Sequence, residues 1–95
     1  IKILIKMNDL NNPDLKSKTK KHLTKSIVVY NDDHNSFDWV ISSFIDLLKH
    51  DLQQAEQCAH LIHFKGKCGV KSGSLKELKP YKDGLIDRGL SAVIE

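Results

Sequence analysis

The sequence has only two cysteines and no long apolar run, and each shortage excludes a class of protein. Cys58 and Cys68 lack metal-type spacing, and two cysteines alone do not make a disulfide framework. No apolar stretch approaches the roughly 20 residues that a membrane-spanning helix needs. The opening IKILIKM carries lysines inside what would be the apolar region of a signal peptide. We therefore expect no membrane partner and a reducing, cytoplasmic setting.

The short motifs of common enzymes are absent as well. The sequence contains no Gly-rich phosphate loop, no G-x-S-x-G and no H-E-x-x-H. His60 and His63 are spaced i, i+3 on one expected helix, but the spacing places no third metal ligand. Cys58 falls between the apolar positions of that helix, as small buried hydrophobes usually do. We therefore expect neither an enzyme nor a metal or other cofactor.

Charge divides the 95 residues unevenly within a chain long enough for one small domain. Residues 1–26 hold seven lysines against two acidic residues, whereas residues 27–95 hold eight basic and ten acidic residues. The segment NDLNNPDLKSKTKKHLTKS, residues 8–26, has almost nothing apolar to bury, so residues 1–25 are expected to form a flexible basic extension and 26–95 the folded domain. A small basic-tailed nucleic-acid-binding module remains the alternative function. We do not expect nucleic acid as a partner, because the lysines lack interleaved aromatic residues for base stacking.

The first half of residues 26–95 predicts one strand and two helices. SIVVY, residues 26–30, is β-branched and aromatic, as strands are. A helix capped by Asn35 or Ser36 follows and ends near His50, because apolar residues recur at helical spacing. Asp51 and Gln54 resemble the capping pair of a second helix, which Gly66 stops.

The second half predicts a strand over KCGVKS, residues 67–72, and then a third helix. Ser74 and Glu77 have capping-box spacing at its start, and Gly89 ends it before a last strand, SAVIE. Pro80 is expected to shorten or kink this helix. The order β-α-α-β-α-β predicts an α+β domain, with a small three-stranded antiparallel sheet packed against three helices.

Asn31, Asp32 and Asp33 form an unusual polar run directly after the first expected strand. Two carboxylates and an amide are costly to bury and unnecessary for a simple turn, although N-D-D alone is more often a turn than a site. VVYNDDHNSFDWV, followed by HLIHFKGKCGV, resembles the ClpS family of adaptor proteins from about Ser26 onwards.

The resemblance implies a fold like the C-terminal domain of the ribosomal stalk protein. It also implies an adaptor, expected to be monomeric, that binds proteins carrying a destabilising N-terminal residue (an N-degron), bulky and hydrophobic or aromatic. The adaptor would deliver them to a Clp-type ATPase and its protease, with the N-terminal extension needed for delivery.

The same resemblance implies roles for individual residues. Asn31 and His63 would contact the free α-amino group, Asp32 would hold the leading backbone groups, and Asp33 would orient the loop. An ammonium has three donors and no acceptor, so amide, carboxylate and neutral imidazole acceptors suit it.

A hydrophobic pocket for the first side chain would lie beside this polar set. Its expected lining comes from the two helices that flank the loop, and consists of Phe37, Val40, Ala59 and Ile62. The family usually has Thr-Pro-Met where this chain has Asn35-Ser36-Phe37. A rigid ring at the pocket mouth in place of a flexible thioether is expected to alter which residues fit.

Overall fold

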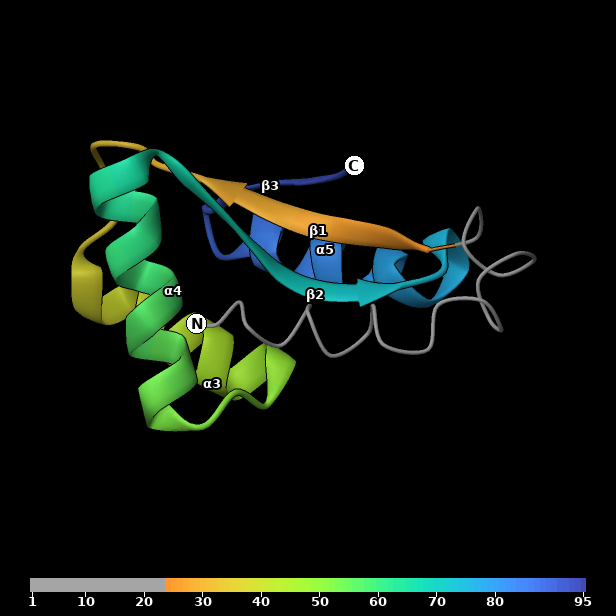
Figure 1. Cartoon of the computed structure of the whole chain (residues 1–95), viewed down its shortest axis with the longest axis horizontal. Coiled ribbons are helices and arrows are strands. Elements are labelled where there is room, and N and C mark those ends of the chain that lie inside the picture. The colour runs from red at the N-terminus through yellow and green to blue at the C-terminus, as the bar shows by residue number, and fades with distance from the viewer. Residues whose placement is uncertain (1–23) are drawn as a thin grey trace, which may run out of the picture.

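The computed structural model describes residues 24–95 and contains every element that the sequence pattern predicts. The expected extension, residues 1–25, lies outside the described residues except for its last two positions, and the first strand already begins at Lys25. The elements in chain order are β1 (Lys25–Tyr30), α3 (Phe37–Leu48), α4 (Leu52–Lys65), β2 (Lys67–Gly73), α5 (Leu75–Asp87) and β3 (Ser91–Ile94) (Figure 1). The predicted α+β class and element order are confirmed.

The three strands form an antiparallel sheet in the order β2-β1-β3. β1 takes the central position, where Ile27 and Val29 are almost completely buried. The pairing with β2 shifts between Ile27 and Val28, which marks a bulge in β2. β1 is therefore fixed on both sides up to Tyr30, and the polar run begins where this support ends.

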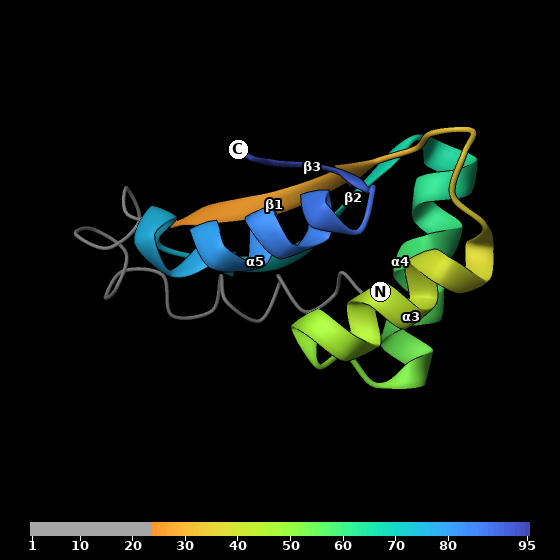
Figure 2. The same ribbon diagram turned by 180° about the vertical axis from the view of Figure 1, so that it is seen from behind.

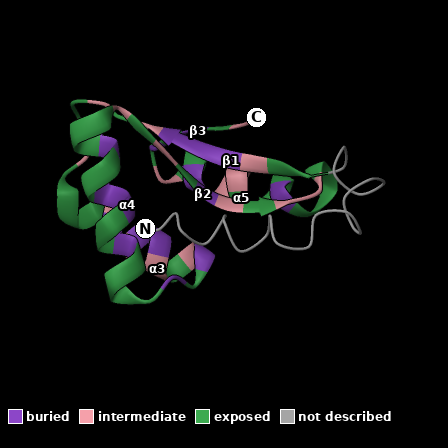
Figure 3. Ribbon diagram, viewed as in Figure 1, coloured by how far each residue is buried: buried purple, intermediate pink, exposed green. Residues whose placement is uncertain are grey.

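Helix α5 lies along one face of the sheet, while α3 and α4 pack together at one end of it (Figures 1 and 2). The core fills the space between the sheet and the helices, and its largest fully buried side chains include Phe44, Leu78 and Leu85 (Figure 3). None of the helices in residues 24–95 is long and apolar enough to cross a membrane.

Serine and aspartate side chains start the three helices. Ser36, one of the two residues considered for the first cap, accepts a hydrogen bond from the backbone N–H of Trp39 at 3.0 Å. Asp51 accepts one from the N–H of Gln54 at 2.8 Å. Ser74 and Glu77 form a complete capping box.

Of the two effects expected of Pro80, shortening or kinking of the third helix, shortening does not occur. Helix α5 continues past Pro80 to Asp87, and Pro80 is exposed. The carbonyl that loses its N–H partner at a proline can be hydrated on an exposed helix face, which reduces the cost of the missing hydrogen bond.

Arg88, at the end of α5, fastens α3 to the rest of the domain. Its guanidinium lies over the Trp39 ring at 5.1 Å and donates to Asp46 at 3.2 Å. Its carbonyl accepts a 3.0 Å hydrogen bond from the Trp39 indole N–H. The start of α3, which borders the polar run, is held in place by these contacts.

Candidate functional site

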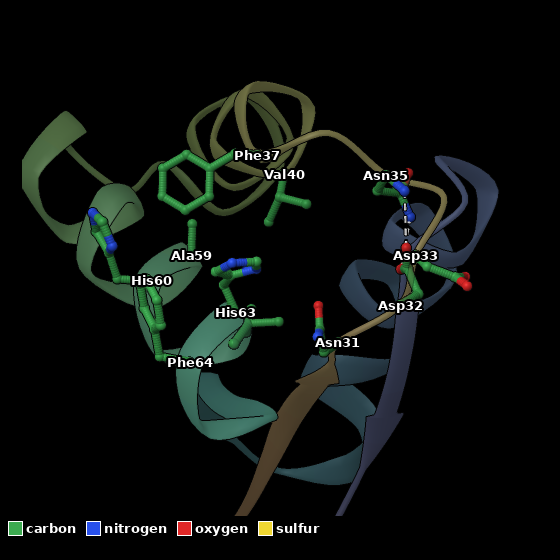
Figure 4. A pocket seen from close by; sticks show the side chains of 11 residues that line it. Asn31, Asp32, Asp33, Asn35, Phe37, Val40, Ala59, His60, His63 and Phe64 are labelled. Atoms are coloured by element: carbon green, nitrogen blue, oxygen red, sulfur yellow. Dashed lines mark hydrogen bonds between the residues drawn. The ribbon is translucent and has the colours of Figure 1, made fainter.

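A hollow of about 630 Å³ lies between the β1–α3 loop, the first turns of α3 and the second half of α4 (Figure 4). The structure brings all eight sequence-predicted site residues to this one hollow, although they come from three segments of the chain. The lining residues are Asn31, Asp32, Asp33, Asn35, Phe37, Val40, Ala59, His60, Ile62, His63 and Phe64.

The β1–α3 loop is organised by the carboxylate of Asp32. One of its oxygens accepts hydrogen bonds from the backbone N–H groups of His34 at 2.9 Å and Asn35 at 2.8 Å. The other oxygen accepts from the Asn35 side-chain amide at 2.8 Å. The same amide donates to the carbonyl of Gly89 at 2.9 Å, so the loop is tied to the α5–β3 corner.

The same hydrogen bonds lower the pKa of Asp32. Partial burial raises the pKa, but the bonds from the backbone and side chain of Asn35 and from the backbone of His34 outweigh it. The net effect holds the pKa of Asp32 below its ordinary value. The carboxylate therefore stays ionised at neutral pH and keeps the loop in one conformation.

Asp33 does not perform the loop-orienting role expected for it. Its side chain is 99% exposed, and its nearest charged partner is the His34 ring, 3.7 Å away. In Figure 4 its carboxylate points away from the hollow. Loop orientation belongs to Asp32 instead, because Asp32 is the residue whose side chain faces the backbone N–H groups of the turn.

Asn31 and His63 face the hollow with uncommitted polar groups (Figure 4). The backbone N–H of Asn31 donates to the carbonyl of Gly66 at 2.9 Å, which fixes the end of β1 beside the end of α4. Within the described residues, neither the Asn31 amide nor the His63 ring has a hydrogen-bond partner. The His63 ring packs edge-on against Phe64, with 4.7 Å between ring centroids.

The apolar part of the hollow is lined by the four residues predicted for it. Ala59 and Ile62 on α4 are buried and form its floor, and Val40 on α3 is half-buried. Phe37 is 39% exposed and lies at the mouth (Figure 4). The hollow thus combines an apolar floor with free hydrogen-bond acceptors.

Sequence reasoning missed three lining residues, which are Asn35, His60 and Phe64. His60 was considered only as a metal ligand, and Asn35 only as a helix cap. Phe64 belongs to the HFKGK motif, where its position next to His63 was the available signal. In residues 24–95 no three His, Cys, Asp or Glu side chains are grouped closely enough to hold a metal ion.

The fold and the hollow together define a small α+β binding domain that presents acceptors and an apolar floor in one pocket. The chain belongs to the ClpS family, described as ATP-dependent Clp protease adaptor protein, whose family model matches residues 20–92. This is a family of adaptors rather than proteases, and membership implies a Clp ATPase and its substrates as partners.

Proposed function

We propose that this chain is a monomeric adaptor that binds substrate proteins by a free N-terminal residue with a bulky hydrophobic or aromatic side chain. It then delivers them to a Clp ATPase and its protease. The proposal is carried by two acceptors, on Asn31 and His63, that have no hydrogen-bond partner in the described part of the chain and that lie in the same hollow as a buried apolar floor.

The acceptors match an α-ammonium group. An ammonium has three donors and no acceptor, so it needs an amide oxygen, a neutral imidazole nitrogen and a further acceptor. The second carboxylate oxygen of Asp32 accepts one hydrogen bond and retains lone-pair capacity for a leading backbone N–H. Asp33 adds negative charge close to the loop, which attracts a cationic chain end.

The apolar floor matches the first side chain of such a ligand. A charge-assisted hydrogen bond contributes about 1.5–3 kcal/mol, and burial of a Leu- or Phe-sized side chain a further 1.5–3 kcal/mol or so. Association costs roughly 4–15 kcal/mol. One such hydrogen bond and one buried side chain together barely cover this cost, so binding should require several of the acceptors at once.

The test compares two peptides of one sequence beginning with Phe, one with a free and one with an acetylated N-terminus. Acetylation removes the charge and most donors of the amine, so the affinity is expected to fall at least tenfold, or about 1.4 kcal/mol. His63→Ala is expected to weaken binding of the peptide with the free amine. His34→Ala is its matched control, because His34 is an exposed histidine of the loop that does not line the hollow. Equal binding of both peptides would contradict the proposal.

Delivery is tested separately from binding by a truncation. Removal of residues 1–23 leaves β1 complete, because that strand begins at Lys25. Peptide affinity is expected to be unchanged, while ATPase-dependent degradation of a substrate with an N-terminal Phe is lost. Normal degradation by the truncated protein would contradict a role for the extension in delivery.

A further inference from the structure

His60 lies between two phenylalanine rings at the rim of the hollow. Its ring meets Phe37 of α3 edge-on, with 4.9 Å between centroids and 65° between planes. On the other side it is stacked on Phe64, one turn further along α4, at 5.8 Å and 8°. His60 therefore joins the two helices that border the hollow through an aromatic contact (Figure 4).

The contact matters because the core does not hold the Phe37 ring. Phe37 is the first residue of α3 and remains 39% exposed. His60 is itself exposed, but its stacking on Phe64 and its place within a helix limit its freedom. The orientation of the ring at the pocket mouth thus depends on an imidazole that is not part of the apolar floor.

We infer that His60 is a positioning residue that sets which first side chain the hollow prefers. By holding the Phe37 ring, it presents an ordered aromatic wall above the small methyl group of Ala59. A planar aromatic side chain forms edge-to-face or offset contacts with such a wall, which are favourable beyond the area they bury. A branched aliphatic side chain gains only the burial. This inference rests on the proposed function and adds a preference for Phe, Tyr or Trp over Leu or Ile at the first position.

His60 has no competing role among the residues that the structure describes. A metal site with His63 would need a further donor, and no such group of side chains occurs in residues 24–95. The aromatic neighbours on both sides of the ring explain its placement without a metal.

The experiment measures the affinities of peptides that differ only in the first residue, Phe, Trp, Leu or Ile, for three proteins. Wild type is expected to favour Phe and Trp over Leu and Ile by about fivefold, the size of one aromatic pair contact. His60→Ala is expected to bring this ratio close to one. His60→Phe, which retains a planar ring at the position, is expected to restore it.

Two further measurements separate the possible failures. Phe64→Ala removes the stacking partner of His60 without touching Phe37, and it is expected to reduce the ratio as well. Each variant is also measured with acetylated peptides. The ratio of the affinities for free and acetylated peptides reports on recognition of the amine and does not depend on the orientation of the Phe37 ring. If acetylated and free peptides bind wild type equally, the proposed function fails and this inference fails with it. If the amine is required but His60→Ala keeps the full aromatic preference, or His60→Phe does not restore it, only the inference is overturned.

Discussion

Two connections in this domain perform the same task, which is to lead from a strand into a helix capped by serine. The β2–α5 connection does so with Ser74, whose hydroxyl accepts from the N–H of Glu77 at 3.1 Å. The Glu77 carboxylate in turn accepts from the N–H of Ser74 at 2.9 Å. The β1–α3 connection spans residues 31–36, although Ser36 alone caps α3.

The difference indicates which connection is functional. In β2–α5, the side chains of Ser74 and Glu77 are both committed to the helix start. In β1–α3, Asp32 and Asn35 fasten a longer loop, while the side chains of Asn31 and Asp33 take no part in capping. Polar groups that are not used by the fold and that lie at a hollow are available to a ligand, and the β1–α3 connection lines the hollow described above.

The largest effect is expected when the longer loop loses its organiser. Asp32→Ala removes three hydrogen bonds and leaves two backbone N–H groups to water, so the free energy of unfolding should fall by about 1.5–3 kcal/mol. Peptide affinity should fall as well, because the loop no longer holds Asn31 and Asn35 in place. Urea unfolding and peptide titration of one sample measure both effects.

Asp32→Asn is the matched control, because it keeps one acceptor oxygen for the backbone N–H groups. It is expected to lose less stability than Asp32→Ala.

The pKa of Asp32 is lowered in the folded state, so its stabilising effect is complete above about pH 3.8 and is lost as pH falls through the folded pKa. If Asp32→Ala changes neither the free energy of unfolding nor the peptide affinity, the β1–α3 connection has no role that the β2–α5 connection lacks.

A smaller effect, confined to binding, is expected from Asn31→Ala. Its side chain lacks a hydrogen-bond partner within residues 24–95, so the free energy of unfolding should change little. Peptide affinity should fall about tenfold, or roughly 1.4 kcal/mol. A loss of stability without a loss of affinity would show that Asn31 supports the fold rather than the ligand.

The reverse pattern is expected from Ser74→Ala in the shorter connection. Loss of the cap should lower the free energy of unfolding by about 1 kcal/mol. The affinity for peptides should remain unchanged, because Ser74 does not line the hollow of the β1–α3 loop. Weaker peptide binding by this variant would mean that the two connections are not independent.

The smallest effect is expected from a change of pH, which should alter the free energy of unfolding through His50. This residue lies in the third connection, between α3 and α4. His50 is 7% exposed, and its Nε2–H donates to the Val70 carbonyl at 2.9 Å. Its Nδ1 is buried and has no hydrogen-bond partner among residues 24–95. Burial lowers the pKa of His50, an effect to which Lys71 adds, while the Val70 bond and Asp51 oppose it. The free energy of unfolding should therefore decrease as pH falls below about 6.5, where the unfolded chain takes up the proton more readily.

His34→Gln is the control for this pH dependence, because His34 is highly exposed. It should leave the decrease unchanged, whereas His50→Gln should reduce it. Urea unfolding between about pH 5 and 8 checks both variants. A pH dependence that follows His34 rather than His50 would contradict this assignment.

The elements could be predicted from the sequence because their signals are local. Apolar spacing indicated α3, and the serine and aspartate caps marked the helix starts. The placement of the eight predicted residues around one hollow depended on the resemblance of N-D-D and HFKGK to a known family. The continuation of α5 past Pro80 could not be predicted, because the cost of a proline in a helix depends on whether the freed carbonyl reaches water, and this exposure depends on the tertiary structure.

The remaining details depend on contacts between distant segments. Asn35 looked like a helix cap, but its amide bonds the Gly89 carbonyl, 54 positions away. His60 and Phe37 meet only because α3 and α4 pack together. The hydrogen bonds that orient the loop are accepted by Asp32 and not by Asp33, because adjacent acidic residues in a loop are distinguished by side-chain direction and not by residue type.

The Asn35–Gly89 hydrogen bond also bears on the order in which the domain is made by the ribosome. β1 is synthesised first among the described strands, yet it pairs with β3, which is synthesised last. A nascent chain from which residues 89–94 have not yet emerged contains the whole β1–α3 loop but lacks the Gly89 carbonyl that anchors it and one neighbour of the central strand. Because such long-range pairing forms slowly and late, the β1–α3 loop should acquire its final shape only after these residues have left the ribosome. Pulse proteolysis of nascent chains stalled at increasing lengths would show this. Protection of the loop should appear abruptly as residues 88–94 emerge from the ribosome.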